Sequence, residues 1–303
     1  MQVFTHPACQ AHDTGTGHPE SPARLASVVR ALEAAHPDLD WQQAPRASRG
    51  QLLAVHSEEL LASVLEADPE PRVWLDPDTI LSPHSADAAL RAAGAVVAAV
   101  DAVMANRTDR AFCAVRPPGH HATATHAMGF CLFNNIAVGA RHALDKHGLE
   151  RVAIVDFDVH HGNGTQAIFA NEARVLFASS HQFPLYPGSG AVHERGCGNI
   201  TNVPLAAGDG SEAFRRAWRE RLLPHVDAFR PQLLMISAGF DGHRRDPLAE
   251  LQLETEDYAW ATRELVRIAR THCDGRVVST LEGGYDLQAL AESVVAHVDV
   301  LHF

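Results

Sequence analysis

The feature that most constrains the fold is an apolar run that turns polar within a few residues. Residues 152–155 (VAIV) are typical of a fully buried parallel strand. The eight residues that follow, from Asp156 to Asn163, include two aspartates and two histidines. Strand side chains alternate faces, so Asp156, Asp158 and His160 project to one side. A carboxylate and an imidazole two residues apart can bind one cation. The sequence therefore predicts that Asp158 and His160 bind a catalytic metal.

Apolar strand-like runs alternate with helical patterns along most of the chain. Such an alternation predicts a parallel sheet covered by helices on both faces. We expect an edge strand at Val3 and Phe4, a loop over residues 76–83, and one α/β domain over residues 1–303. The other strands are expected near residues 111–115, 152–155, 174–179, 200–203, 232–237 and 276–281. The helices are expected near 25–32, 48–66, 86–105, 134–146, 209–229 and 256–272, with a last helix that ends near Val300.

Composition excludes several classes of protein. With 46% apolar and 20% charged residues in 303, the chain can bury a large core and is not expected to be disordered. The formal net charge of -12, without a basic run, argues against direct nucleic-acid binding and suits cationic substrates. Assembly into a homo-oligomer is compatible with the sequence.

Cysteine usage and the N-terminus predict a cytoplasmic location. An odd, scattered set of cysteines suggests reduced thiols, and the chain shows no signal peptide. The long apolar helix near residues 86–105 is interrupted by Asp87, Arg91 and Asp101, so no membrane span is expected. The five cysteines are Cys9, Cys113, Cys131, Cys197 and Cys273.

Unusual polar clusters follow directly after the predicted strands. In open parallel sheets, ligand sites form beyond the carboxyl ends of the strands. Clusters at several such ends therefore predict one convergent site. The clusters are His120 with His121, Asp158 with His160, Ser179 with His181, Asp241, and Tyr285.

A third metal ligand is expected, because a catalytic zinc keeps three protein ligands and one open position. Asp241 follows the last residues of a predicted strand and is the best candidate. Alone, Asp241 would more simply cap the next turn, but the Asp-x-His pattern favours a ligand. The oxygen-rich set could also hold Fe²⁺, Mn²⁺ or Co²⁺.

Acid–base chemistry is predicted for the tandem histidines after the Pro-Pro-Gly turn. His120 and His121 have imidazoles suited to proton transfer near neutral pH. Asp156 and Asn163 could orient them: a carboxylate partner favours imidazolium, and an amide leaves its histidine free to accept a proton. Tyr285, after two glycines, could stabilise a developing oxyanion.

These residues lie in motifs that resemble the zinc-dependent histone deacetylases of the arginase–deacetylase superfamily. The resemblance is to the class II branch and its bacterial relatives, including acetylpolyamine amidohydrolases. It implies a sheet of about eight parallel strands with helices on both faces. The motifs are HPESPAR at 18–24, RPPGHH at 116–121, GFC at 129–131, DFDVHHGNGT at 156–165, AGFD at 238–241, DPL at 246–248 and EGGY at 282–285.

The resemblance also implies the metal sites. Asp158, His160 and Asp241 would bind one catalytic Zn²⁺, with Fe²⁺ or Co²⁺ as possible replacements. A structural K⁺ would lie at Asp156 and Ser179, completed by main-chain oxygens of Asp158, His160 and Ser180.

The catalytic roles follow from the same resemblance. His121 is expected to act as general base and then acid, and His120 as its electrostatic partner, paired with Asp156. Asn163 as the partner of the second histidine is the class II form. Tyr285 would polarise the acyl carbonyl.

The substrate is expected to be an acyl-lysine protein or peptide, or an acetylated small amine. The tunnel walls implied by the resemblance are Gly129, Phe130, Tyr186, Leu248 and Gly283, with Tyr186 where Phe is commoner. Leu248 stands where polyamine-specific relatives can carry an acidic gatekeeper, which favours acyl-lysine. The rim aspartate that grips a peptide main chain is expected to be absent, because counting back from Pro83 places Leu81 there.

Two other classes are weighed against this interpretation. The two-metal ureohydrolases of the superfamily resemble this chain, but the positions of their additional carboxylates are Gly162 and Gly239, which cannot bind a metal. A non-catalytic metal-binding or scaffold protein is disfavoured, because the ligands, both histidines and Tyr285 occur together.

Overall fold

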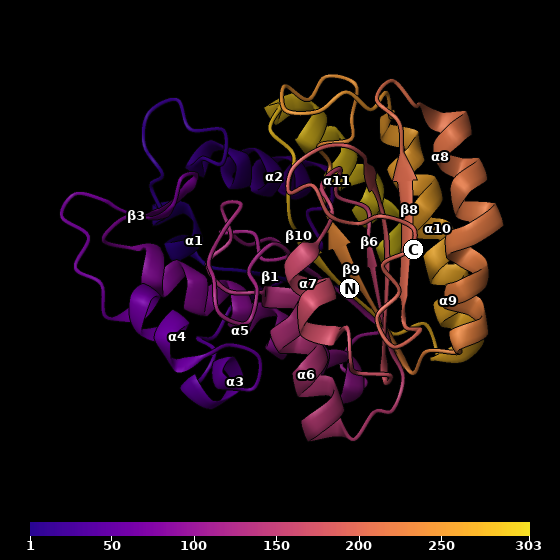
Figure 1. Cartoon of the computed structure of the whole chain (residues 1–303), viewed down its shortest axis with the longest axis horizontal. Coiled ribbons are helices and arrows are strands. Elements are labelled where there is room, and N and C mark those ends of the chain that lie inside the picture. The colour runs from indigo at the N-terminus through magenta and orange to yellow at the C-terminus, as the bar shows by residue number, and fades with distance from the viewer.

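The main sheet has eight strands, all parallel, in the order β2-β1-β5-β10-β9-β6-β7-β8 (Figure 1). The structure is a computed structural model and describes residues 1–303. The predicted parallel α/β fold of about eight strands is confirmed. The strands are β1 (Gln2–Thr5), β2 (Asp40–Gln43), β5 (Arg110–Cys113), β6 (Val152–Asp156), β7 (Val175–Gln182), β8 (Ile200–Leu205), β9 (Leu233–Ala238) and β10 (Val277–Leu281).

Helices cover both faces of this sheet (Figure 1). One layer comprises α1 (Pro7–Ala11), α5 (Ser85–Met104), α6 (Asn135–His147) and α7 (Asn163–Phe169), with α3 (Arg49–Leu53) and α4 (Glu58–Leu65) packed outside it. The opposite layer comprises α2 (Pro22–Ala35), α8 (Ser211–Ala217), α9 (Leu223–Phe229), α10 (Thr255–His272) and α11 (Leu287–His302).

The centre of the sheet is completely buried, as its apolar sequence predicts. Every residue of β6 and β9 is buried, so both faces of these strands pack against helices. Burying one large aliphatic side chain, such as Ile154 or Ile236, contributes roughly 2 kcal/mol. The central strands are therefore a firm base for the loops at their carboxyl ends.

Two predictions near the N-terminus are wrong. β1 is not the edge strand, because β2 pairs with its outer side. β2 is polar and half-exposed, so it lacks the apolar signal of a strand. Residues 76–83 are not only loop: β4 (Thr79–Leu81) pairs antiparallel with β3 (Val73–Asp76). Ile80 and Leu81 are buried, which stabilises this hairpin.

Two predicted helices are interrupted. The segment 48–66 forms α3 and α4, and Ser57 caps the second helix by accepting a hydrogen bond from the Leu60 N–H. The segment 209–229 contains a π-helical turn, Trp218–Leu222, between α8 and α9. Pro224 lies just after this turn and lacks the N–H that a regular helix would need, which accounts for the change of register.

The structure also tests the predictions on membrane spans and disulfides. None of its helices combines the length and apolarity needed to cross a membrane. All five cysteines are unpaired. The assignment of residues 1–303 to one domain stays a prediction.

One core residue should make folding sensitive to acid. His297 of α11 is fully buried against Phe157 and Phe240 and lies between the hydroxyls of Thr262 (2.6 Å) and Ser279 (2.9 Å). Burial lowers the pKa of His297 from 6.5 to about 3. The folded state therefore favours the neutral imidazole. Its stabilising contribution is complete above pH 6.5 and is lost as the pH falls toward 3.

We expect His297→Asn to reduce the acid sensitivity of folding. In the wild type, this one histidine should cost on the order of 2 kcal/mol of unfolding free energy between pH 7 and pH 5. Denaturant titrations at both pH values measure that difference, and replacing the exposed His193 in the same way is the control. An equal pH dependence in wild type and His297→Asn would contradict the assignment.

Candidate active site

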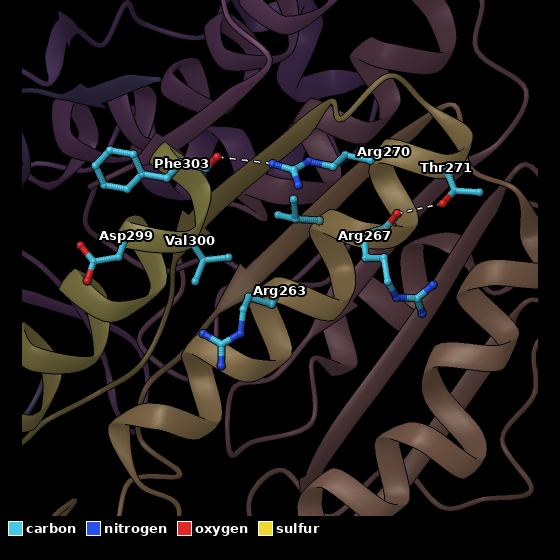
Figure 2. Close-up of a pocket in the computed structure, with 8 residues that line it drawn as sticks. Arg263, Arg267, Arg270, Thr271, Asp299, Val300 and Phe303 are labelled. Carbon is cyan, nitrogen blue, oxygen red and sulfur yellow. Dashed lines mark hydrogen bonds between the residues drawn. The ribbon is translucent and has the colours of Figure 1, made fainter.

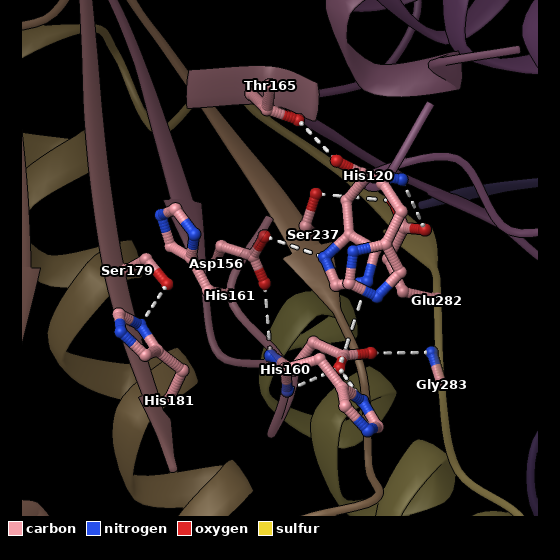
Figure 3. A network of polar contacts seen from close by, with 12 residues as sticks. His120, Asp156, His160, His161, Thr165, Ser179, His181, Ser237, Glu282 and Gly283 are labelled. Atoms are coloured by element: carbon pink, nitrogen blue, oxygen red, sulfur yellow. Dashed lines mark hydrogen bonds and ion pairs between the residues drawn. The ribbon is translucent and has the colours of Figure 1, made fainter. Parts of the chain in front are cut away.

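The predicted polar clusters lie at or beyond the carboxyl ends of the strands, and Figure 3 shows His120, Asp156 and His160 close together there. Asp158, His160 and Asp241 are buried, and one ligand atom from each lies within 4.8 Å of the others. His160 Nδ1 lies 3.0 Å from Asp158 Oδ1 and 3.2 Å from Asp241 Oδ2. The structure thus brings together the three predicted ligands, one pair from the loop after β6 and the third from the loop after β9.

Main-chain donors fix both carboxylates. Gly283 N–H donates to Asp158 Oδ2 (2.8 Å), and Val159 N–H donates to Asp241 Oδ1 (2.9 Å). Each aspartate keeps its other oxygen directed at His160. Main-chain N–H groups therefore orient both carboxylates toward His160.

The electrostatics of this triad suit a bound cation. Burial alone would lower the pKa of His160, but hydrogen bonds to Asp158 and Asp241 raise it to about 10. The two carboxylates thus hold one positive charge between them. A divalent ion could take the place of that proton, since histidine ligands bind metals in the neutral form. Two carboxylate oxygens and one imidazole suit Zn²⁺ and, because the set is oxygen-rich, Fe²⁺ or Co²⁺.

Glycines make room for the triad. A Cβ on Gly239 would lie 2.0 Å from Asp158 Oδ2, and a Cβ on Gly283 would lie 2.1 Å from Asp241 Oδ2. Any larger residue would displace a carboxylate. A Cβ on Gly162 would likewise lie 2.3 Å from Oδ2 of Asp156. Neither Gly162 nor Gly239 can ligate, so the site offers no ligands there for a second metal.

The tandem histidines have different hydrogen-bond partners, and their pKa values are shifted in opposite directions. His120 Nδ1 lies 2.9 Å from Asp156 Oδ2. Burial would lower the pKa of His120, but the charges of Asp158 and Asp156 hold it well above 6.5. For His121, burial and the charges of His120 and His160 depress the pKa.

The hydrogen bond of His121 defines which nitrogen faces the cavity. Its Nδ1 lies 2.8 Å from Asn163 Oδ1 and donates to that oxygen. Nε2 is then unprotonated and free to accept a proton. The predicted partners Asp156 and Asn163 are thus found in place, one at each imidazole.

Glu282 is a buried residue to which the sequence analysis gave no role. Its Oε2 accepts hydrogen bonds from the N–H groups of Gly119 (2.6 Å) and His120 (3.2 Å), and its Oε1 accepts one from Ser237 Oγ (3.2 Å). Burial raises the pKa of Glu282 to about 7, although the charge of His120 opposes this shift. The only sequence signal for Glu282 was its place directly after β10, and a lone glutamate in that place forms no pattern.

Tyr285 is held by its main chain and by a cation. Its N–H donates to Asp246 Oδ2 (2.7 Å), and the Arg24 guanidinium lies 4.8 Å from its ring centroid. Arg24 also donates to the carbonyls of Gly284 and Glu282, both at 2.6 Å. Arg24 therefore ties the N-terminal HPESPAR motif to the loop that carries Tyr285.

A cavity of about 260 Å³ leads to the triad. The predicted wall residues Gly129, Phe130, Tyr186 and Leu248 line it, but Gly283 lies beside the ligand carboxylates and is absent from the lining. The full lining is Asp78, His121, Gly129, Phe130, His160, Leu185, Tyr186, Leu248 and Tyr285.

The prediction that no aspartate lies at the rim is wrong. Leu81 is buried in β4, whereas Asp78, in the turn of the β3–β4 hairpin, lines the cavity. Asp78 Oδ1 accepts hydrogen bonds from Gly129 N–H (3.1 Å) and Thr79 Oγ1 (2.8 Å). Counting back from Pro83 could not reveal this position, because the hairpin was not expected.

The residues expected to bind K⁺ are adjacent. Asp156 and Ser179 are register partners on β6 and β7. Asp156 Oδ1 accepts from Asp158 N–H (3.1 Å), and Ser179 Oγ lies 2.9 Å from His181 Nδ1. The potassium site itself stays a prediction.

A separate, open groove lies between α10 and α11 (Figure 2). It carries Arg263, Arg267 and Arg270 beside Val300 and Phe303, and it shares no residue with the cavity at the triad. The groove is formed by the C-terminal parts of α10 and α11. These lie toward the end of the sheet where the parallel strands begin, opposite the candidate active site.

Comparison with known proteins identifies relatives over nearly the whole chain. Residues 18–301 match the histone deacetylase domain. A histone deacetylase-like amidohydrolase of Pseudomonas aeruginosa is 42% identical over 89% of this chain and 73% of its own length. A probable deacetylase of Archaeoglobus fulgidus is 40% identical over 94% of this chain and 81% of its own length. The crystal structure of the HDA15 HD domain superposes with a TM-score of 0.94 and 36% identity, covering 99% of this chain and 87% of that one.

The glycine cradle predicts a specific loss of metal binding. Gly239→Ala should raise the dissociation constant for Zn²⁺ roughly 10- to 100-fold, because its Cβ displaces the Asp158 carboxylate. Equilibrium dialysis of metal-free protein measures the constant. Gly50→Ala is the control, since a Cβ there meets nothing within 4 Å. Equal zinc affinity in the two variants would count against this site.

Proposed function

Because this chain belongs to the histone deacetylase family, we propose that it is a metal-dependent amide hydrolase that removes acetyl or other acyl groups from lysine side chains. The observation that carries the proposal is the position of the Asp158–His160–Asp241 triad and His121 at a narrow cavity. Protein or peptide acyl-lysine is the favoured substrate.

The cavity walls suit an extended aliphatic chain. Tyr186 lies edge-on to His121, with ring centroids 5.1 Å apart, and Phe130 lies edge-on to Tyr285 at 5.9 Å. Aromatic faces can bury the methylene groups of a lysine side chain while leaving polar contacts for its amide. The amide would then lie between Tyr285 and His160, which both line the cavity.

Asp158, His160 and Asp241 would hold the metal, with Zn²⁺ the first choice. A divalent ion there would supply Lewis-acid chemistry, polarising the amide carbonyl and making a nearby water more acidic. The site would hold one ion, because Gly162 and Gly239 have no side chain to bind a second. This argues against the two-metal ureohydrolase alternative.

The two histidines then divide the proton transfers. His121 Nε2 accepts the proton of the attacking water, because Nδ1 already donates to Asn163. His121 subsequently passes a proton to the leaving amine. His120 keeps its proton, held by Asp156, and so supplies positive charge beside the reacting atoms.

Tyr285 would stabilise the negative charge that develops on the carbonyl oxygen. Burial raises the pKa of its hydroxyl well above 10, so the group stays protonated and can donate a hydrogen bond. The Arg24 guanidinium over the ring and the Asp246 contact to the Tyr285 N–H hold the residue toward the cavity.

The proposal also includes a second cation and a location in the cell. A structural K⁺ at Asp156 and Ser179 is supported by their adjacent positions. A cytoplasmic location is supported by the unpaired cysteines. A homo-oligomer stays a prediction. The complete set of reacting groups disfavours a non-catalytic role.

Acetylpolyamine hydrolysis is the second candidate function. Leu248 at the cavity presents no charge to a polyamine, which favours acyl-lysine. Asp78 at the rim supports either substrate, because its carboxylate could accept a hydrogen bond from a peptide N–H or from an ammonium group.

The proposed chemistry predicts a large effect of one hydroxyl group. With zinc and an acetyl-lysine reporter, Tyr285→Phe should lower kcat roughly 100- to 1,000-fold, and His121→Ala should remove most activity. Tyr258→Phe is the matched control, because the buried Tyr258 hydroxyl has no hydrogen-bond partner and lies outside the cavity. Normal turnover by both Tyr285→Phe and His121→Ala would refute the mechanism.

Substrate choice should respond to charge at residue 248. Wild-type kcat/KM should be highest for acyl-lysine peptides when acetyl-lysine, longer acyl-lysines and acetylpolyamines are compared. Leu248→Glu should raise the relative kcat/KM for acetylpolyamines about fivefold, since one partly exposed charge pair contributes about 1 kcal/mol.

Leu248→Gln is the control for this prediction, since it changes polarity without adding charge. An equal response to Gln and Glu would show that charge is not responsible. Dominant acetylpolyamine turnover by the wild type would overturn the preferred substrate.

A further inference from the structure

A second cluster of metal-binding side chains lies outside the candidate active site, between α5 and α6. His142 Nε2 and His147 Nε2 lie 2.8 and 2.7 Å from the same atom, Asp101 Oδ1. Their rings are 5.5 Å apart and nearly perpendicular, at 79°. Both ring nitrogens therefore point at one position in space.

We infer that Asp101, His142 and His147 form a second site for a divalent transition-metal ion such as Zn²⁺. One ligand atom from each lies within 4.8 Å of the other two. Two imidazoles and one carboxylate are a ligand set that Zn²⁺ takes in proteins, and the fourth position stays open to water. Neither the proposed reaction nor the cavity at the triad uses these residues.

The present contacts need to open only slightly to admit an ion. Metal–ligand distances of about 2.0–2.2 Å in a tetrahedral site separate ligand atoms by roughly 3.4 Å. Asp101 can move outward by the remaining fraction of an ångström because its side chain is 42% exposed.

The two helices that carry the cluster are closely packed. α5 and α6 pack so closely that a Cβ on Gly139 would lie 2.4 Å from Val96. The residue that caps α6 at its other end, Asn134, donates to the carbonyl of Ala122, just after the tandem histidines. An ion bound at the cluster would thus cross-link the helix layer that supports the catalytic loop, without touching the reacting atoms.

Zinc stoichiometry tests this inference on the full chain. Equilibrium dialysis against Zn²⁺ alone should show that the double variant His142→Asn, His147→Asn binds one equivalent fewer than the wild type. The same variant should lose the part of the zinc-induced rise in Tm that this site provides, with turnover of the acetyl-lysine reporter retained. The control replaces the exposed His193 and His225 with Asn and should lose no equivalent.

The same measurement distinguishes a missing second metal site from a missing metal at the catalytic triad. His160→Asn should remove the equivalent bound at the catalytic triad and leave the second one in place. Equal stoichiometry of the wild type and the His142/His147 double variant would overturn the inference, whatever His160→Asn does. A loss of one equivalent only in the double variant would support it and would count against a metal at the triad.

Discussion

Two buried carboxylates that share one imidazole determine how the rest of this site must be built. Asp158 and Asp241 come from loops after neighbouring strands, and each has an oxygen within 3.2 Å of His160 Nδ1. Two anions this close and this deeply buried require a positive charge between them. The two carboxylates raise the pKa of His160, which favours a proton there, and a divalent ion can supply the charge in its place.

The parallel sheet makes this arrangement possible. β6 lies between β7 and β9, and β10 follows on the other side of β9, so their carboxyl ends deliver ligands, partners and the Tyr285 loop to one edge. Asp156, the last residue of β6, and Asn163, the first residue of α7, flank the loop that carries two of the ligands, and these residues orient His120 and His121. The carboxylate partner favours a protonated His120, whereas the amide partner suits a neutral His121.

The sequence was most informative where side-chain chemistry is concentrated in a few neighbouring residues. The Asp158-x-His160 spacing, the tandem histidines and the glycines at 162 and 239 all predicted features that the structure brings together. Glu282 was missed because a single glutamate after a strand carries no pattern, and only the fold shows that it accepts the N–H groups of Gly119 and His120. Asp78 was missed because its position depends on a short hairpin with a weak strand signal.

Diffraction from crystals grown with Zn²⁺, recorded at the zinc absorption edge, tests the central claim most directly. The account predicts one anomalous peak among Asp158, His160 and Asp241, with each ligand atom at about 2.0–2.2 Å from it. Two peaks in this position, or none, would contradict a single catalytic metal at the triad.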